Sequence, residues 1–437
     1  MKRGRPVAIL LCLLLPAAAG QRQSASSKAP SIGPAKLITL KVTGTARYTD
    51  KEILAASGLQ IGQNAADGDF KEAVRRLGNS GLFSDIVYSY TSSGTGVKLE
   101  VQLTDIDASK LVPAHFENLV WFTDAELLAQ LRRRVPLFQG QVPLAGDLAD
   151  RIEEALQAIL DEKQISGRVD YLRESTLEGG KVIGTSYSVE DLEIRIGNVE
   201  FRGAGPDLLS GLQAASRRLM GAPYVRTSLA KIATVDFLPV CLKSGYLKAS
   251  FTDADARIAS QGNGEVEVAA IFPLTPGKVY VTSGVIWKGN SVLKAEELQG
   301  LLHLPPGRPV DAVRLLGDVE NVGKLYRSRG YMTVQIKPDA QFDDEHGAVH
   351  YDLNVIEGDL YKMGELEIAG LDTQATVRMR AAWTLREDQP YNADYPKKFL
   401  EDTRQLVPRG GPWNISIHES LDAKDKTVDV EIRFKQQ

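Results

Sequence analysis

The sequence predicts a mixed α+β protein made of five tandem modules, each with the element order β-α-α-β-β. Two observations predict this fold class. Short apolar alternations that end in a polar residue and glycine recur along the chain, and each is followed by two helix patterns, a glycine and two further alternations. One strand, two helices and a hairpin bury their apolar faces as a three-stranded mixed sheet with both helices on one face. We expect the modules to form an elongated array.

The residues before the first module indicate secretion. Residues 1–19 carry cations near the start, then a short apolar run and three alanines, which is typical of a cleaved signal peptide. The run is too short to span a bilayer, which needs about 20 residues. Residues 20–35 are rich in Ser, Ala, Gln and Pro, which predicts a flexible leader. Beyond the signal, Cys241 is the one remaining cysteine, and we expect it to be a small buried hydrophobe.

Composition narrows the range of partners. The chain of 437 residues has a net charge of −4, and removal of the signal, whose charges are all positive, makes it more negative. This balance gives no indication of nucleic acid or of an anionic membrane surface as a partner. The length exceeds one ordinary core of about 100–150 residues, so several domains are required.

Each module opens with a strand that ends in a residue suited to a tight turn. Four of these segments end in glycine, and they are residues 37–44, 196–203, 281–289 and 366–370. The fifth is 116–120, where Asn118 stands in place of glycine. Glycine, and asparagine to a lesser degree, tolerates a positive φ. We therefore expect that backbone conformation after each first strand.

Two helix patterns follow each first strand. In the first module, Thr49 and Glu52 have the spacing of a capping box, and Gly58 ends the helix. The second helix has a single apolar stripe. The stripe residues are Phe70, Ala73, Val74 and Leu77 in the first module, Leu148, Ile152, Ala155, Leu156 and Ile159 in the second, and Leu315, Val319, Val322 and Tyr326 in the fourth. Pro239 is expected to kink the corresponding helix of the third module.

Two strands close each module. The pairs are 86–91 with 97–103, 169–172 with 182–189, 247–251 with 266–272, 332–336 with 349–356, and 413–418 with 428–434. The first strand should pair in parallel with the third through a right-handed crossover, which leaves the second strand at an edge. The resulting modules are residues 36–108, 109–190, 191–276, 277–358 and 359–437.

This pattern resembles the POTRA domain of the family that includes the outer-membrane assembly factor BamA and the two-partner secretion transporters. The residues that carry the resemblance are the glycines after the first strands, Gly44, Gly203, Gly289 and Gly370, and the helix-glycine-aromatic junctions at 77–83, 243–246 and 326–331. The second module departs most, since it lacks both that glycine and an aromatic residue after Gly167. BamA-like proteins continue into a membrane barrel, for which the three residues after Phe434 leave no room. We therefore expect the barrel to be absent or supplied by another chain.

The resemblance implies a non-catalytic polypeptide-binding scaffold of outer-membrane protein assembly or secretion, in a Gram-negative periplasm and held near the outer membrane by a partner. An edge strand can accept an extended polypeptide as a further strand. The candidate edge residues are Val87, Tyr88, Ser89, Tyr90, Met332, Thr333, Val334, Gln335, Asn414, Ile415, Ser416 and Ile417. The alternative for each is an ordinary strand capped by the neighbouring module. Expected partners are unfolded or extended segments of outer-membrane proteins and a separate membrane barrel subunit, with no nucleic acid and no direct membrane span.

Two other functions stay open. One is an envelope scaffold that docks a single folded partner, such as a division or secretion component, and the other is a periplasmic hydrolase with a distributed site. No nucleophile elbow, zinc-protease, redox or Walker motif is present, so we expect no enzyme activity and no cofactor. The cluster 343–346 with His350 contains metal-ligand residue types, but strand positions four apart lie about 13 Å apart. We interpret that cluster, and Asp253 with Asp255, as hairpin turns without a metal.

Overall fold

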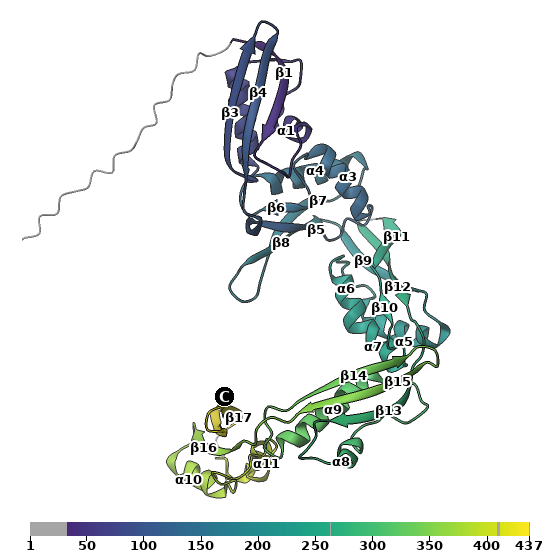
Figure 1. Cartoon of the computed structure of the whole chain (residues 1–437), viewed down its shortest axis with the longest axis vertical. Helices are drawn as coiled ribbons and strands as arrows, with labels where there is room; N and C mark the ends of the chain where they lie inside the picture. Colours follow the sequence, from purple (N-terminus) through teal and green to yellow (C-terminus); the bar gives the residue numbers. More distant parts are fainter. Residues whose placement is uncertain (1–32, 263, 409–410, 437) are drawn as a thin grey trace, which may run out of the picture. The chain divides into compact units, whose positions relative to one another are not determined.

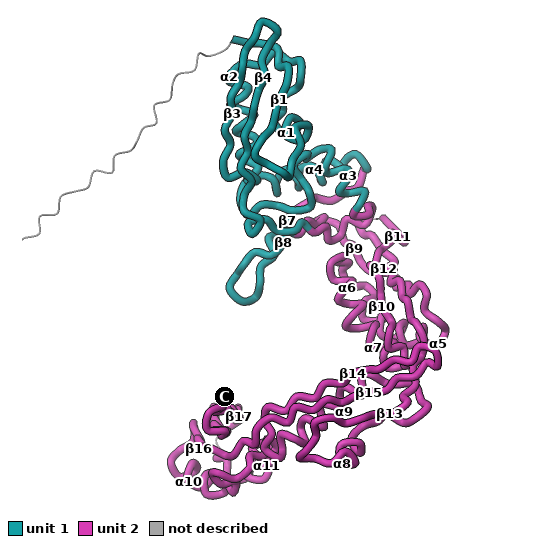
Figure 2. Tube along the Cα trace, viewed as in Figure 1, with its two compact units in different colours: residues 1–114, 125–163, 171–185 teal, residues 115–124, 164–170, 186–437 magenta. Residues whose placement is uncertain are grey.

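The computed structural model describes residues 33–262, 264–408 and 411–436 (Figure 1). The predicted signal and most of the predicted leader lie outside the described residues. The described chain is mixed α+β, with five small mixed sheets. It divides into two compact units, one of residues 1–114, 125–163 and 171–185 and the other of residues 115–124, 164–170 and 186–437 (Figure 2). Within the described ranges, no helix is both long enough and apolar enough to cross a membrane.

The first group of elements follows the predicted order with one addition. It contains β1 (Ala35–Thr43), α1 (Asp50–Ser57), β2 (Asn64–Ala65), α2 (Asp67–Asn79), β3 (Phe83–Ser93) and β4 (Gly96–Asp105). The sheet order is β2-β1-β4-β3, with β1 parallel to β4 and β3 antiparallel to β4. Thr49 and Glu52 form the predicted capping box, and Gly58 ends α1 in the left-handed conformation. The predicted parallel pairing and the edge position of the second strand are confirmed here.

The second group shares this plan. It contains the short 3₁₀ helix η1 (Ala108–Lys110), β5 (Leu111–Phe116), α3 (Asp124–Arg134), β6 (Gln141–Pro143), α4 (Leu148–Glu162), β7 (Arg168–Ser175) and β8 (Val182–Glu190). The sheet order is β6-β5-β8-β7. The residues of this group are divided between the two compact units.

The third group departs most from expectation. It contains β9 (Glu193–Arg202), α5 (Pro206–Ser216), η2 (Arg217–Leu219), α6 (Ser228–Ile232), the π-helical segment η3 (Ala233–Phe237), α7 (Leu238–Lys243), β10 (Ser250–Phe251), β11 (Asp255–Gly262) and β12 (Glu265–Thr275). Pro239 interrupts the long helix as predicted, and a π-helical turn lies directly before α7 because proline supplies no N–H to the helical ladder.

The predicted second strand at 247–251 is wrong for most of its length. Only β10 lies there, and the main edge strand is β11. Both pair antiparallel with β12 on the same side, so they are two parts of one interrupted strand. The prediction that Asp253 and Asp255 form a hairpin turn is also wrong, since Asp255 begins β11 and Asp253 lies in the interruption.

The last two groups have three-stranded sheets. The fourth contains β13 (Val281–Lys288), α8 (Ala295–Gln299), α9 (Ala312–Arg327), β14 (Gln335–Asp343) and β15 (Ala348–Ile356). The fifth contains β16 (Lys362–Ala369), α10 (Thr373–Ala382), α11 (Tyr395–Asp402), η4 (Arg404–Leu406), β17 (Trp413–Asp422) and β18 (Thr427–Gln436). Their orders are β13-β15-β14 and β16-β18-β17, with the first strand parallel to the third in each.

A fourth strand in the first two sheets corrects the predicted count of three. The segment between the two helices pairs antiparallel with the first strand as β2 and as β6. In the other three groups the equivalent contact is a single bridge, and its partner is a proline each time, namely Pro223, Pro309 and Pro390. Proline has no N–H to donate to the ladder, and in β6 the one proline, Pro143, lies at the end of the strand.

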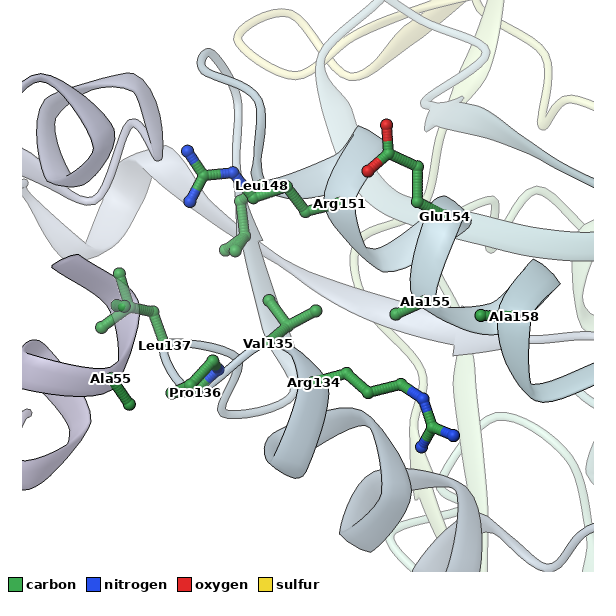
Figure 3. A pocket seen from close by; sticks show the side chains of 11 residues that line it. Ala55, Arg134, Val135, Pro136, Leu137, Leu148, Arg151, Glu154, Ala155 and Ala158 are labelled. Carbon is green, nitrogen blue, oxygen red and sulfur yellow. The ribbon is translucent and has the colours of Figure 1, made fainter. Parts of the chain in front are cut away.

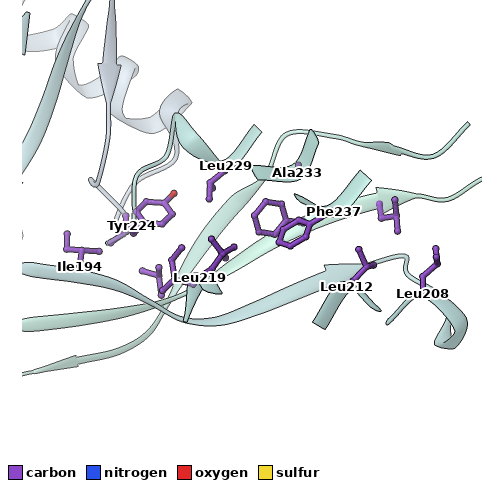
Figure 4. Close-up of a cluster of buried hydrophobic side chains, with 14 of the residues drawn as sticks. Ile194, Leu208, Leu212, Leu219, Tyr224, Leu229, Ala233 and Phe237 are labelled. Atoms are coloured by element: carbon purple, nitrogen blue, oxygen red, sulfur yellow. The ribbon is translucent and has the colours of Figure 1, made fainter. Parts of the chain in front are cut away.

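The apolar stripes of the long helices lie in the core, as predicted. In α2, Phe70, Ala73 and Leu77 are buried and Val74 is half-buried. All the stripe residues named above for α4 and α9 are buried. Cys241 is fully buried in the core of the third group, in the same cluster as Phe237 and Phe272, which confirms the expected role of that cysteine. Figure 4 shows this cluster, with Phe237 labelled.

The glycines after the first strands have the predicted backbone conformation. Gly44, Gly203, Gly289 and Gly370 have φ between +83° and +87°. A Cβ at each would collide with a carbonyl oxygen of the third strand of the same sheet. Asn118 does not share the positive φ that we expected of it. Its side chain instead accepts a hydrogen bond from the N–H of Val189 at 2.7 Å and donates one to the carbonyl of Val189 at 3.0 Å.

Candidate polypeptide-binding edges

The strand β3 carries the first predicted edge. It is the last strand of its sheet and contains Val87, Tyr88, Ser89 and Tyr90. Val87 is 54% exposed, whereas the hydroxyl of Tyr88 lies 3.3 Å from a carboxylate oxygen of Asp67 on α2. The Tyr90 ring lies 5.6 Å from the Phe70 ring, measured between centroids. The strand therefore turns its aromatic face to the helix and its other face to solvent, and its outer side faces no further strand of the described chain.

The strand β17 carries the third predicted edge. It ends the fifth sheet and contains Asn414, Ile415, Ser416 and Ile417. Asn414 and Ser416 are exposed, whereas Ile415 packs on the core. Trp413 holds the start of the strand, since its indole N–H donates to the carbonyl of Pro408 at 2.9 Å. Along β17, Trp413, Ile415 and Glu419 are half-buried and the other strand residues are exposed, so the face toward the core is covered only in part.

The second predicted edge is wrong as a strand. Met332, Thr333 and Val334 lie in a turn, and only Gln335 belongs to β14. The turn is closed by a hydrogen bond from the Val334 N–H to the carbonyl of Tyr331 at 3.3 Å, and Met332 packs against the core of the fifth group. The pairing of this segment with β15 therefore begins only at Gln335. The strand β14 itself begins later and contains Pro338, which removes one backbone donor from this edge.

Sequence reasoning missed the edge formed by β10 and β11. A cavity of about 660 Å³ lies between this interrupted strand and the helix formed by α6, η3 and α7. Its lining includes Asp124, Arg226, Asp253 and Asp255. The sequence contained one indication that this edge strand is interrupted, namely Pro273 in the central strand β12. A proline there prevents regular pairing with the strand beside it.

Another cavity lies in the first compact unit, between α1 and α4 (Figure 3). Its volume is about 460 Å³, and alanines of both helices form much of its lining. Its two arginines are occupied: Arg134 pairs with Glu162, and Arg151 donates to Asp147 at 2.7 Å and to a backbone carbonyl at 3.0 Å. The lining therefore offers no unpaired cation to an anionic ligand.

The acidic cluster before β15 forms a turn, as predicted. A carboxylate oxygen of Asp343 accepts hydrogen bonds from the N–H groups of Glu345 and His346, and the other lies 2.8 Å from Nδ1 of His346. The hydrogen bonds from His346 hold the pKa of Asp343 below its usual value. Asp344 instead contacts Lys248, and His350 lies on β15. Residues 343–346 therefore form a hydrogen-bonded loop before β15.

Part of the chain matches a known domain family. Residues 280–358, which hold β13 to β15, match the POTRA model, described as a surface antigen variable number repeat. The match confirms the predicted resemblance to POTRA domains.

Several solved structures are also similar to parts of the chain. One is the crystal structure of POTRA3-5 of BamA from Haemophilus influenzae, at 17% sequence identity, covering 56% of this chain and 96% of the other with a TM-score of 0.43. Another is the N-terminal domain of Omp85 from Thermosynechococcus elongatus, at 18% identity, covering 56% and 97% with a TM-score of 0.24. A third is CdiB from Escherichia coli, at 15% identity, covering 36% and 27% with a TM-score of 0.20.

Proposed function

We propose that this protein is a non-catalytic periplasmic scaffold of outer-membrane protein assembly or secretion, which binds extended polypeptide segments along β3 and β17. The POTRA match of residues 280–358 supports the class of protein. The observation that carries the binding mode is that β3 and β17 each end a sheet over ten or more residues. Main-chain hydrogen bonds to such an edge depend little on client sequence, which suits a binder of many unfolded chains.

Two other edges fit this role less well, and the edge strand β7 is shorter, at eight residues. In β14, Lys337 and Pro338 are adjacent, and both residue types discourage the addition of a strand. The edge of the third group is interrupted between β10 and β11. Neither β3 nor β17 contains a proline or a lysine. We therefore assign general client binding to β3 and β17.

The proposal includes the organisation of the chain. Five POTRA-like modules span residues 36–108, 109–190, 191–276, 277–358 and 359–437, each with two helices on one face of its sheet. Unfolded outer-membrane protein segments are the clients, and a separate membrane barrel subunit holds the scaffold at the outer membrane. The short bridges at Pro309 and Pro390 support the repetition of one plan, because they recur at the same place in successive groups.

Site-specific photo-crosslinking tests the binding mode. A photoreactive residue at Val87 or at Ser416 should capture a urea-unfolded outer-membrane protein diluted into the sample. The matched controls are Gln102 and Arg433, which lie directly opposite these two residues on the central strands β4 and β18. Capture at the edge positions and not at the controls supports the proposal. Equal capture at all four positions contradicts it, and capture of one folded envelope protein alone favours the docking scaffold.

Val87→Lys and Ser416→Lys give a complementary test. A lysine on an edge strand disfavours the addition of another strand because its charge would have to be desolvated. Each change should weaken client capture at its own edge and leave the other edge unaffected. Loss of capture at both edges from one change would indicate a folding defect rather than two binding edges.

A further inference from the structure

The core-side face of the edge strand β17 is uncovered beyond Ile415. Ile417 and Leu421 are 36% and 43% exposed. The residues directly opposite them on the central strand, Ile432 and Val428, are fully buried. Side chains that lie directly opposite each other in an antiparallel pair point to the same face of the sheet. The two exposed aliphatic side chains of β17 therefore lie on the core side of the sheet.

The placement of the helices explains why this face is uncovered. In the first group, the helix α2, of 13 residues, packs along the edge strand β3. In the fifth group, the second helix, α11, has eight residues, and α10 packs against β16, which lies at the other edge of the sheet. The core-side residues Tyr88 and Tyr90 of β3 are consequently half-buried, whereas Ile417 and Leu421 are exposed.

The other face of β17 is polar. Its exposed residues, which alternate with those of the core side, are Asn414, Ser416, His418, Ser420 and Asp422. Three of them lie opposite charged residues of β18, namely Arg433, Glu431 and Asp429. The strand β17 thus has an uncovered apolar side and a polar side.

Both sides border the unpaired backbone edge of the same strand. The last strand of a sheet has N–H and C=O groups that can pair with a further strand. Successive side chains of an added strand point alternately to the two faces of the sheet. Alternate residues of a bound segment therefore lie beside Ile417 and Leu421, and the residues between them lie on the side of Ser416 and Ser420. Burial of the two aliphatic side chains stabilises the complex only where the segment is apolar on the core side.

We propose that β17 selects extended segments in which apolar and polar residues alternate, and that Ile417 and Leu421 determine this preference. The inference rests on the proposed function, which supplies the edge and the extended client. It adds a pattern that the client must carry, and it distinguishes β17 from β3, along whose core side α2 packs. Membrane-spanning strands of outer-membrane barrels alternate apolar and polar residues in this way.

Two fluorescent peptides of the same composition test the preference. One is an eight-residue alternation of valine and threonine, and the other has two valines at each end and four threonines between them. Both residue types are β-branched, so the peptides differ little in strand propensity. In the second peptide no two valines are four positions apart, so none of its registers places a valine beside both Ile417 and Leu421.

Binding to the full chain is measured by anisotropy, with Val87→Lys present to weaken the β3 edge. The alternating peptide should bind about two- to five-fold more tightly, the range expected for one additional cross-strand apolar pair. The double variant Ile417→Thr, Leu421→Thr should remove this preference, because it removes both aliphatic side chains of the core side. Val377→Thr is the matched control and should keep the preference, since Val377 is 62% exposed on α10, the helix that packs against β16.

Disulfide trapping reports the face directly and does not require the double variant. The alternating peptide carries a cysteine in place of one valine or of one threonine. Under mild oxidation, Leu421→Cys should be linked mainly to the peptide with cysteine at the valine position, and Ser420→Cys to the peptide with cysteine at the threonine position. The native Cys241 is fully buried and does not compete.

The outcomes separate the two proposals. Equal binding of the two peptides, a preference that survives the double variant or is lost in Val377→Thr, or trapping without selectivity for one face overturns the assigned preference. Each of these results leaves strand addition at β17 intact. Failure of both peptides to bind the chain that carries Val87→Lys overturns strand addition at β17, and with it that part of the proposed function.

Discussion

The ammonium nitrogen of Lys248 lies 2.6 and 2.8 Å from the two carboxylate oxygens of Asp344, although the residues are 96 positions apart. The same ammonium lies 4.5 Å from the centre of the Phe342 ring, and the buried Tyr280 donates its hydroxyl hydrogen to Asp344. These contacts join the turn after α7 to the loop between β14 and β15. They tie the third group of elements to the fourth.

This contact should couple the two groups. Lys248→Met and Asp344→Asn should each speed hydrogen exchange in the loop before β15, because each removes the same ion pair. The double variant should exchange little faster than either single variant, since the pair is lost once. Effects that add in full would show that Lys248 and Asp344 act independently.

The same contact should weaken in acid. The hydrogen bonds from Lys248 and Tyr280 hold the pKa of Asp344 below its usual value of 3.8, with Lys278 adding to the effect. A carboxyl whose pKa is lowered by folding contributes stability that is fully present above pH 3.8 and is lost as the pH falls through the lowered value. Protection of the loop against hydrogen exchange should therefore fall in that window, and Asp344→Asn should reduce the pH dependence to the part that Asp343, whose pKa is also lowered, contributes in the same loop. Unchanged acid sensitivity in that variant would contradict this account.

The glycine after each first strand should resist substitution. Gly289→Ala places a Cβ against the carbonyl oxygen of Val355 at a φ of +83°, and it should destabilise β13 and β15 by about 2 kcal/mol or more. Gly317→Ala is the matched control in the same group, because nothing lies within 4 Å of its added Cβ inside α9. That control should be neutral or stabilising by up to about 1 kcal/mol. Hydrogen exchange of peptides from β15 measures both, and a tolerated Gly289→Ala would refute the steric argument.

The asparagine at the equivalent place should act through its side chain. Asn118→Ala removes both hydrogen bonds with Val189 and should lower the free energy of unfolding by about 1–2 kcal/mol. Asn118→Asp keeps the acceptor for the Val189 N–H and should cost less. Hydrogen-exchange rates at the end of β8 compare the two variants. Equal effects of the two changes would exclude a role for the side-chain oxygen that accepts from the Val189 N–H.

The buried thiol of Cys241 should be inert in the native protein. Burial raises its pKa to about 11, and the thiolate is the reactive form. Labelling by a thiol reagent at pH 8 should be slow until urea unfolds the third group, and should then match an ordinary cysteine. Rapid labelling without denaturant would show that this core opens readily.

Two of the three candidate edge segments lie in strands at the end of a sheet, and most of the third lies in a turn. The residues proposed in β3 and β17 lie at the ends of their sheets, because period-two alternation and a preceding glycine are local signals. The segment 332–335 has the same alternation, yet contacts with the fifth group hold Met332 in a turn. In the third group, the edge strand is interrupted at Thr252 because Pro273, on the neighbouring strand β12, supplies no N–H.

The sequence by itself determined the repeated order of strands and helices, the buried helix stripes and the glycine turns, because each depends on neighbours within a few positions of the chain. Tertiary structure alone decided which short segments became β2 and β6, where the third edge breaks open into a cavity, and that Lys248 meets Asp344. Those features depend on residues brought together from distant parts of the chain, and periodicity carries no information about which of them will meet.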